Sequence, residues 1–138
     1  MKSFEELDCW KKAASLRRRV SALVKTFPSD EKYKLIDQMI RSTRSATAQI
    51  AEGFGRFHYQ ENIQFCRQAR GSLFELIDHF IVAREERYVS DEAFFEARNE
   101  IDDCLALLNG YINYLVKAKS SSKVEESTEV YASLTDNN

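Results

Sequence analysis

The sequence predicts an all-α fold, an antiparallel up-down-up-down bundle of four helices. Helix breakers are scarce, with 4 glycines and 1 proline in 138 residues, so the chain has room for few turns. Apolar residues recur at steps of three and four residues over four long stretches, which is the spacing of one helix face. The connections between these stretches are short, and short connections make consecutive helices antiparallel neighbours. We therefore predict one bundle domain over residues 1–118.

The first helix is predicted to begin at Ser3, because Ser3 and Glu6 have the spacing of a capping box. Its apolar stripe continues to Phe27, and Pro28, the only proline, ends the helix. The second helix is predicted to begin at Ser29, an N-cap residue followed by two acidic residues. The stripe of the first helix comprises Leu7, Trp10, Ala13, Ala14, Val20, Val24 and Phe27.

The second helix is predicted to end at about Gly53, where a left-handed C-cap residue is expected. Gly53 and Gly55 are not a dinucleotide-binding fingerprint, because a helix precedes them and the third glycine is missing. The third helix is predicted to begin near Tyr59. Small residues are frequent in both helices, and folding this hairpin about residue 57 sets them opposite each other. Gly71 in mid-helix costs about 1 kcal/mol relative to Ala, so we predict that the two backbones pack closely there.

The fourth helix is predicted to begin after Ser90, an N-cap residue that Asp91 and Glu92 follow. It is predicted to end near residue 118. The stretch 119–138 is polar and has no cap signal, and we predict that it is a mobile tail.

Composition restricts the classes of function. The net charge is −2, from 20 basic and 22 acidic residues, so any nucleic-acid binding must arise from local patches. No apolar run reaches membrane-spanning length and no signal peptide opens the chain, which predicts a cytoplasmic protein with no membrane partner. Cys9, Cys66 and Cys104 are odd in number, far apart and without metal-ligand spacing, which favours reduced and buried thiols.

Pairs of arginines three residues apart are the first candidate for nucleic-acid binding, since such a pair shares a helix face. Folding the hairpin about residue 57 predicts one cationic patch at mid-height, suited to a phosphate backbone. The alternative is that Glu75 and Asp78 neutralise the patch as ordinary ion pairs. The arginines of the predicted patch are Arg41, Arg44, Arg67 and Arg70.

The turn after the second helix is the second candidate. Arg56 is followed by the rings of Phe57, His58 and Tyr59, and single-strand binders combine a cation with stackable rings in this way. The alternative is a contact between subunits. The run 17–19 of three arginines is weaker evidence, because consecutive helical residues point about 100° apart.

Catalytic and metal sites are not expected. Glu75 and His79 share a helix face, but di-iron bundles use Glu-x-x-His on two helices with two further carboxylates. Cys66 and His58 could form a nucleophile and base pair, but the sequence offers no third group to orient the histidine. Carboxylates that a nuclease site would need are explained more simply as caps and ion-pair partners. We expect no enzyme activity, no cofactor, no metal ion and no small-molecule substrate.

The predicted fourth helix has more apolar surface than a bundle seam needs. A second stripe, displaced by about 60° from the first, runs from Cys104 to Tyr114. Apolar faces of this width are typical of interfaces, where Tyr and Trp are enriched. We predict a homo-oligomer with interface residues Trp10, Leu107, Tyr111 and Tyr114.

Several segments also carry a family resemblance, namely "FEELDCWKKA", "EKYKL", "IAEGFGR", Glu61 followed by Phe65, and "ARGSLFEL". In order and spacing they resemble the 23S rRNA intervening-sequence proteins, also called four-helix bundle proteins. The accessory variability protein of diversity-generating retroelements is a relative of this family. The resemblance covers residues 3–117, with Thr47 where the family has a proline, so this helix should be straighter than the family's norm.

The resemblance implies a ring of five bundles, association with RNA or a ribonucleoprotein, and no catalytic residues. The function predicted is thus a non-enzymatic, homo-oligomeric, RNA-associated protein. The alternative is an oligomeric scaffold that binds proteins and no nucleic acid.

Overall fold

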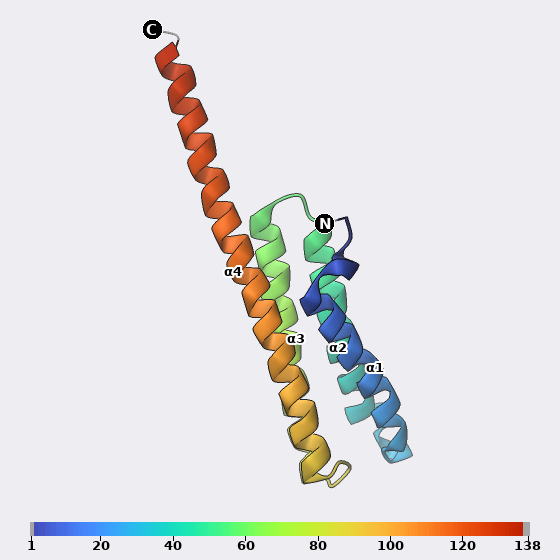
Figure 1. The fold of residues 1–138 in the computed structure, drawn as a ribbon. Helices are drawn as coiled ribbons and strands as arrows, with labels where there is room; N and C mark the ends of the chain where they lie inside the picture. Colours follow the sequence, from blue (N-terminus) through green and yellow to red (C-terminus); the bar gives the residue numbers. More distant parts are fainter. Residues whose placement is uncertain (1, 137–138) are drawn as a thin grey trace.

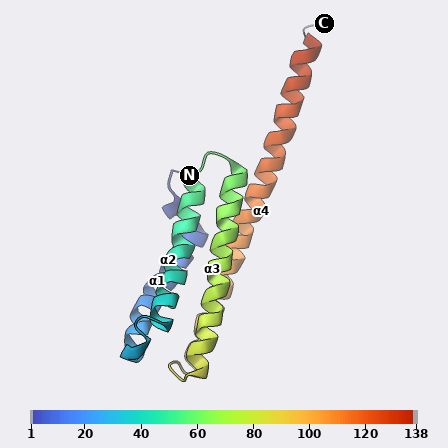
Figure 2. The same cartoon turned by 180° about the vertical axis from the view of Figure 1, so that it is seen from behind.

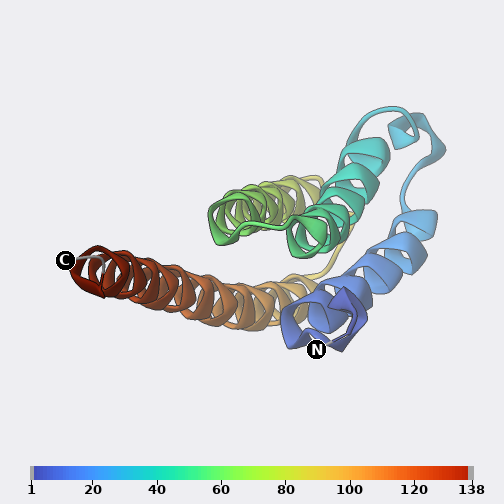
Figure 3. The same ribbon diagram turned by 90° about the horizontal axis from the view of Figure 1, so that it is seen from above.

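The computed structural model describes residues 2–136, and within them all side chains except those of 124–131, 133, 135 and 136. Residues 2–136 form four α helices and no β strand. Each helix packs against the next one in the chain, and α1 also contacts α4, which closes the bundle (Figures 1 and 3). The predicted all-α four-helix bundle is confirmed. The helices are α1 (Asp8–Leu23), α2 (Leu35–Gly55), α3 (Tyr59–Glu85) and α4 (Asp91–Asp136).

Short 3₁₀ turns replace the predicted beginnings of the first two helices. Ser3 caps only the 3₁₀ turn Phe4–Glu6, where its Oγ accepts a hydrogen bond from the Glu5 N–H at 3.1 Å. Leu7 is extended, with ψ of 127°, so α1 begins at Asp8. The capping box therefore marks the first turn of the chain, but the α helix begins five residues after Ser3.

The connection between α1 and α2 is longer than predicted. It contains two 3₁₀ turns, Val24–Thr26 and Ser29–Glu31, on either side of Pro28. At Lys34 the backbone leaves the helical region, with φ −120° and ψ −108°, so α2 begins at Leu35 rather than at Ser29. The Glu31 carboxylate accepts from the Leu35 N–H at 3.0 Å and takes the place of the predicted Ser29 cap.

The beginnings of α3 and α4 agree with the prediction. α3 begins at Tyr59, and α4 begins at Asp91, where Ser90 Oγ accepts from the Ala93 N–H at 3.1 Å. α3 ends in a Schellman motif, with Arg87 at φ 62° and the Tyr88 N–H donating to the Ala83 carbonyl at 2.8 Å.

Neither Gly53 nor Gly71 has the role that the sequence predicts for it. Gly53 is not a left-handed C-cap, because no glycine in residues 2–136 has a positive φ and α2 continues to Gly55. Gly53 is buried, and a Cβ there would lie 2.8 Å from Asn62 Oδ1 and 2.9 Å from Phe65 Cβ. Gly71 is exposed, with nothing within 4 Å of a Cβ. The close approach of α2 and α3 is therefore at Gly53, and the prediction for Gly71 is wrong.

Other small residues do pack between these helices, as predicted. Ser72 Oγ donates to Gln49 Oε1 at 3.0 Å across the hairpin. α2 continues without a break through Thr47. The buried small residues comprise Ser42, Thr43, Ala46, Thr47, Ala69 and Ser72.

The fourth helix does not end near residue 118 but continues to Asp136. No glycine or proline lies between Lys119 and Asp136, and polarity alone does not end a helix. Lys119 Nζ donates to Gln60 Oε1 of α3, and beyond this contact α4 projects past the ends of the other helices (Figures 1 and 2). Residues 137 and 138 of the predicted tail lie outside the described residues.

Candidate nucleic-acid interface

The four arginines of the predicted patch do not lie together. Arg41 is exposed and pairs with Asp37, Nε to Oδ2, at 3.4 Å. Arg70 Nη1 donates to Asn109 Oδ1 of α4 at 3.0 Å. Arg44 lies on the other side of the hairpin, in a depression between α2 and α1. Since Arg44 and Arg70 face different neighbouring helices, the single patch is not formed.

Arg67 is exposed on α3. Within the described part of the chain it has no carboxylate partner, and neither Glu75 nor Asp78 forms an ion pair with any of the four arginines. The direct ion pairs of the alternative prediction are therefore not formed, although Glu75 lines one depression together with Arg41.

The run of arginines in α1 divides between two sides of the helix. Arg19 forms ion pairs with Glu96, at 3.1 Å, and with Glu100, both on α4. Arg17 and Arg18 instead line the depression that contains Arg44. Sequence reasoning missed this grouping because it treated the run as evenly spread around the helix. The available signal was that residues 9–29 contain six basic residues and no acidic residue.

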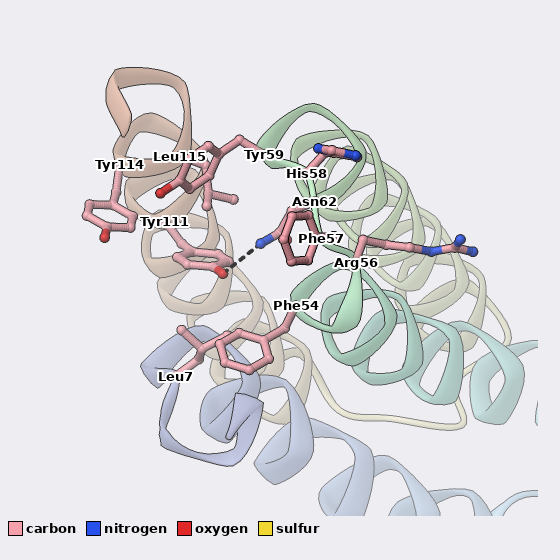
Figure 4. Close-up of a pocket in the computed structure, with 10 residues that line it drawn as sticks. All are labelled: Leu7, Phe54, Arg56, Phe57, His58, Tyr59, Asn62, Tyr111, Tyr114 and Leu115. Carbon is pink, nitrogen blue, oxygen red and sulfur yellow. Dashed lines mark hydrogen bonds between the residues drawn. The ribbon is translucent and has the colours of Figure 1, made fainter. Parts of the chain in front are cut away.

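The turn between α2 and α3 borders an aromatic cavity of about 460 Å³ (Figure 4). The cavity lies between this turn, α4 and the start of the chain at Leu7. Asn62 is buried and donates from Nδ2 to the Tyr111 hydroxyl at 3.0 Å, which fixes the Tyr111 ring as one wall. The lining residues are Leu7, Phe54, Arg56, Phe57, His58, Tyr59, Asn62, Tyr111, Tyr114 and Leu115.

In this turn the guanidinium of Arg56 is occupied by ion pairs, whereas the rings of Phe57 and His58 are exposed to solvent. The Arg56 guanidinium points away from the cavity (Figure 4) and is held by Glu52 at 3.0 Å and Glu61 at 3.7 Å. Two carboxylates thus neutralise the charge that a phosphate would need. The ring of Phe57, by contrast, is 96 % exposed, and His58 beside it is exposed as well. The turn therefore offers stacking surface but no free cation.

The three thiols differ from His58 in their exposure to solvent. Cys9, Cys66 and Cys104 are free and buried. The Cys66 Sγ donates to Asn62 Oδ1 at 3.5 Å, and burial raises the pKa of this thiol to about 12, whereas His58 is exposed. Among the described residues no three His, Cys, Asp or Glu side chains are placed to hold a metal ion.

The predicted second stripe of α4 is divided by the structure. Cys104 is fully buried, and Tyr111 packs against the core while it lines the cavity. Leu107 and Tyr114 point outward, with 41 % and 62 % of their surface exposed. Trp10 is half-buried, with an edge-to-face contact to Phe4 at 5.3 Å. Of the four predicted interface residues, Leu107 and Tyr114 thus present the exposed apolar surface.

Comparisons with known proteins identify the family. No curated protein sequence matches the chain. Within residues 2–136, no helix has the length and apolar character that crossing a bilayer requires. The sequence model described as 23S rRNA-intervening sequence protein matches residues 5–110, from the first 3₁₀ turn into the middle of α4. This match covers most of the chain, and the protein belongs to the 23S rRNA-intervening sequence protein family.

Proposed function

We propose that this protein is a non-enzymatic, cytoplasmic homo-oligomer that associates with RNA. The observation that carries this proposal is a separation of charge along the chain. Residues 8–51, which include α1 and most of α2, contain ten basic and four acidic residues, a net charge of +6. Residues 91–136, which form α4, contain four basic and ten acidic residues, a net charge of −6.

This separation supplies the local basic surface that the overall charge of −2 does not. Since α1 and α2 are neighbours in the bundle, three of their arginines, Arg17, Arg18 and Arg44, line one depression and act together there. A polyanion is attracted to such a surface through its phosphates, largely without regard to sequence. The description of the family names an rRNA, which agrees with this type of partner. The three free, buried cysteines are typical of a reducing compartment and support a cytoplasmic location.

The first test is RNA binding at two salt concentrations, measured by fluorescence anisotropy with a structured RNA and a single strand. We expect binding to both, falling steeply with salt, because each phosphate contact adds about 0.7 to 0.9 to the log–log slope. Phe57→Ala should weaken the binding of the single-stranded RNA by about 1 kcal/mol or more if a base stacks on this exposed ring. Phe74→Ala, at an exposed phenylalanine of α3, is the matched control. No binding by the wild type at low salt would refute the RNA proposal.

The second test is the state of assembly. The resemblance in sequence implies five subunits, which corresponds to 80 kDa from a chain of 16.0 kDa. We expect light scattering at micromolar concentration to give an oligomer near this mass. Leu107→Glu with Tyr114→Glu should release subunits, because buried carboxylates at an apolar contact are costly. Tyr33→Glu, at a ring that is exposed in the connection before α2, should leave the oligomer intact. A wild-type particle of 16 kDa would refute assembly, and an unchanged double variant would refute this interface.

A scaffold that binds another protein is the second candidate. The observation that favours it is the aromatic cavity, which has the size and the apolar lining of a site for a small ligand or a side chain of a partner. The RNA titration separates the two candidates, since a scaffold of this kind requires no salt-dependent RNA binding.

A further inference from the structure

Three arginines from two helices line one depression of about 160 Å³ between α1 and α2. We name it the basic depression. Arg17 and Arg18 come from α1 and Arg44 comes from α2, and the remaining lining residues are Ser21, Ile40 and Thr43. Water occupies about 30 Å³ per molecule in the liquid, so the depression has room for a tetrahedral oxyanion with some of its hydration.

Within the described side chains, no carboxylate compensates this charge. None of the three arginines lies within ion-pair distance of a described aspartate or glutamate. The neighbouring Arg19, by contrast, has two such partners on α4. The sequence explains why the depression lacks such partners, since no acidic residue occurs in 9–23 of α1 or in 38–51 of α2.

Arg17 is held in place before any ligand arrives. Its Nη1 donates to Thr47 Oγ1 at 2.9 Å, and its guanidinium carbon lies 5.9 Å from the centre of the Trp10 ring. Thr47 Oγ1 in turn donates to the Arg44 carbonyl at 3.1 Å, which fixes the hydroxyl with a lone pair toward Arg17. Arg17 is also half-buried. A charge that is partly removed from water and has only a hydroxyl and a ring as partners is unfavourable until an anion approaches.

Arg18 and Arg44 are exposed, and neither guanidinium group has a hydrogen-bond or ion-pair partner among the described side chains. An arginine carries five N–H donors in a planar fork that matches two oxygens of a phosphate. One guanidinium group held by Thr47 and two exposed guanidinium groups around a small depression are therefore suited to a phosphate group.

We propose that the basic depression is a phosphate-binding site, and that it receives phosphates of an RNA backbone. The second part rests on the proposed function, whereas the first part concerns the chemistry of the site alone. A free phosphate or a phosphorylated small molecule is the other source of the same group, and the experiment below separates these sources.

The first arm measures RNA binding by anisotropy at two salt concentrations. Arg18→Glu with Arg44→Glu should weaken binding at least about tenfold and lower the log–log salt slope by about 1.4 to 1.8, the loss of two phosphate contacts. Arg67→Glu with Arg70→Glu makes the same change of charge on α3 and is the matched control, with an expected effect below about threefold. Equal losses in the two double variants would mean a general effect of net charge and would overturn the site.

The second arm uses inorganic phosphate at constant ionic strength and follows the arginine side-chain Nε–H signals by NMR. We expect the signals of Arg17, Arg18 and Arg44 to shift with saturation, and that of Arg67 to stay in place. Wild-type protein that binds no RNA but shows these shifts would refute the proposed function and keep the phosphate site, with a free phosphate as its source. RNA binding by the wild type would keep the proposed function. If phosphate then shifts none of the three arginine signals, and Arg18→Glu with Arg44→Glu binds RNA no more weakly than the control variant, the phosphate site is overturned. A circular dichroism melt confirms that each variant is folded.

Discussion

Raising the pH from 8 to 11 is expected to destabilise this protein strongly, because three buried thiols resist ionisation in the folded state. Cys9 is 2 % exposed, and Cys66 and Cys104 are fully buried. Burial raises the pKa of Cys9 from 9.0 to about 11 and the pKa of Cys66 and Cys104 to about 12. The cause is desolvation, which disfavours the thiolate in an apolar surrounding.

The direction of the effect follows from proton binding in the two states. Below pH 9 the thiols are protonated in both the folded and the unfolded chain, so their contribution to stability is fully present. Between pH 9 and about 11 to 12 the unfolded chain loses three protons that the folded chain keeps, and stability falls as the pH rises. One proton corresponds to about 1.4 kcal/mol per pH unit, so three thiols give a slope of about 4 kcal/mol per pH unit at its steepest. Domains of this size are stable by about 5 to 15 kcal/mol, which this slope removes within a few pH units.

Urea unfolding between pH 8 and 10.5, with a reductant present, measures this slope directly. Cys104→Ala should reduce the slope by about one proton, or 1.4 kcal/mol per pH unit. Ser72→Ala removes another small buried group that does not titrate in this range, and should lower stability without a change of slope. A free energy of unfolding that stays constant to pH 10.5 would show that the folded thiols ionise as freely as the unfolded ones.

The sequence predicts the helices best where a local signal and a hydrophobic stripe agree. Ser90 is followed by two acidic residues and then by an apolar stripe, and α4 begins at the predicted position. At Ser3 and Ser29 the same kind of cap precedes a 3₁₀ turn instead. A cap satisfies the first free N–H groups of either helix type, so the residue pattern alone does not distinguish them. What separates them is the backbone at Leu7 and Lys34, which tertiary packing determines.

The arginine prediction failed for a geometric reason. Folding a hairpin about one residue estimates the height of each side chain along the bundle but not its direction around the helix. Each residue turns a helix by about 100°, so Arg44 and Arg70, at the same predicted height, face α1 and α4 respectively. The basic depression requires the packing of α1 on α2, which no pattern within one helix contains.

The predicted fourth helix is too short because a polar stretch without an apolar stripe carries no signal of packing. No stripe is predicted for residues 119–136, yet they continue the helix, since they contain no glycine or proline that would break it. Apolar periodicity detects packing against a neighbour, and it therefore locates the end of the bundle near Lys119 rather than the end of the helix.

Gly53→Ala and Gly71→Ala are expected to change stability in opposite directions, although both add one methyl group to a helical glycine. Adding Cβ gains up to about 1 kcal/mol in an exposed helix, and Gly71 is exposed with open space around it, so Gly71→Ala should stabilise by about that amount. At Gly53 the new Cβ would lie 2.9 Å from Phe65 Cβ and 3.1 Å from the Asn62 carbonyl oxygen. Neither atom is the end of a flexible side chain, so α2 and α3 must move apart.

Overpacking of this kind costs about 1 to 3 kcal/mol, which exceeds the gain in helix propensity, so Gly53→Ala should destabilise the protein. Gly53→Leu should destabilise it further, because there is no space for the larger side chain. Asn62 also donates to Tyr111, so a displaced α3 should disturb the wall of the aromatic cavity as well. Urea unfolding of the two alanine variants at pH 7, with tyrosine fluorescence as a second signal, checks both signs. Equal stabilisation by the two substitutions would mean that α2 and α3 do not approach closely at Gly53, and that the hairpin packs with a different register.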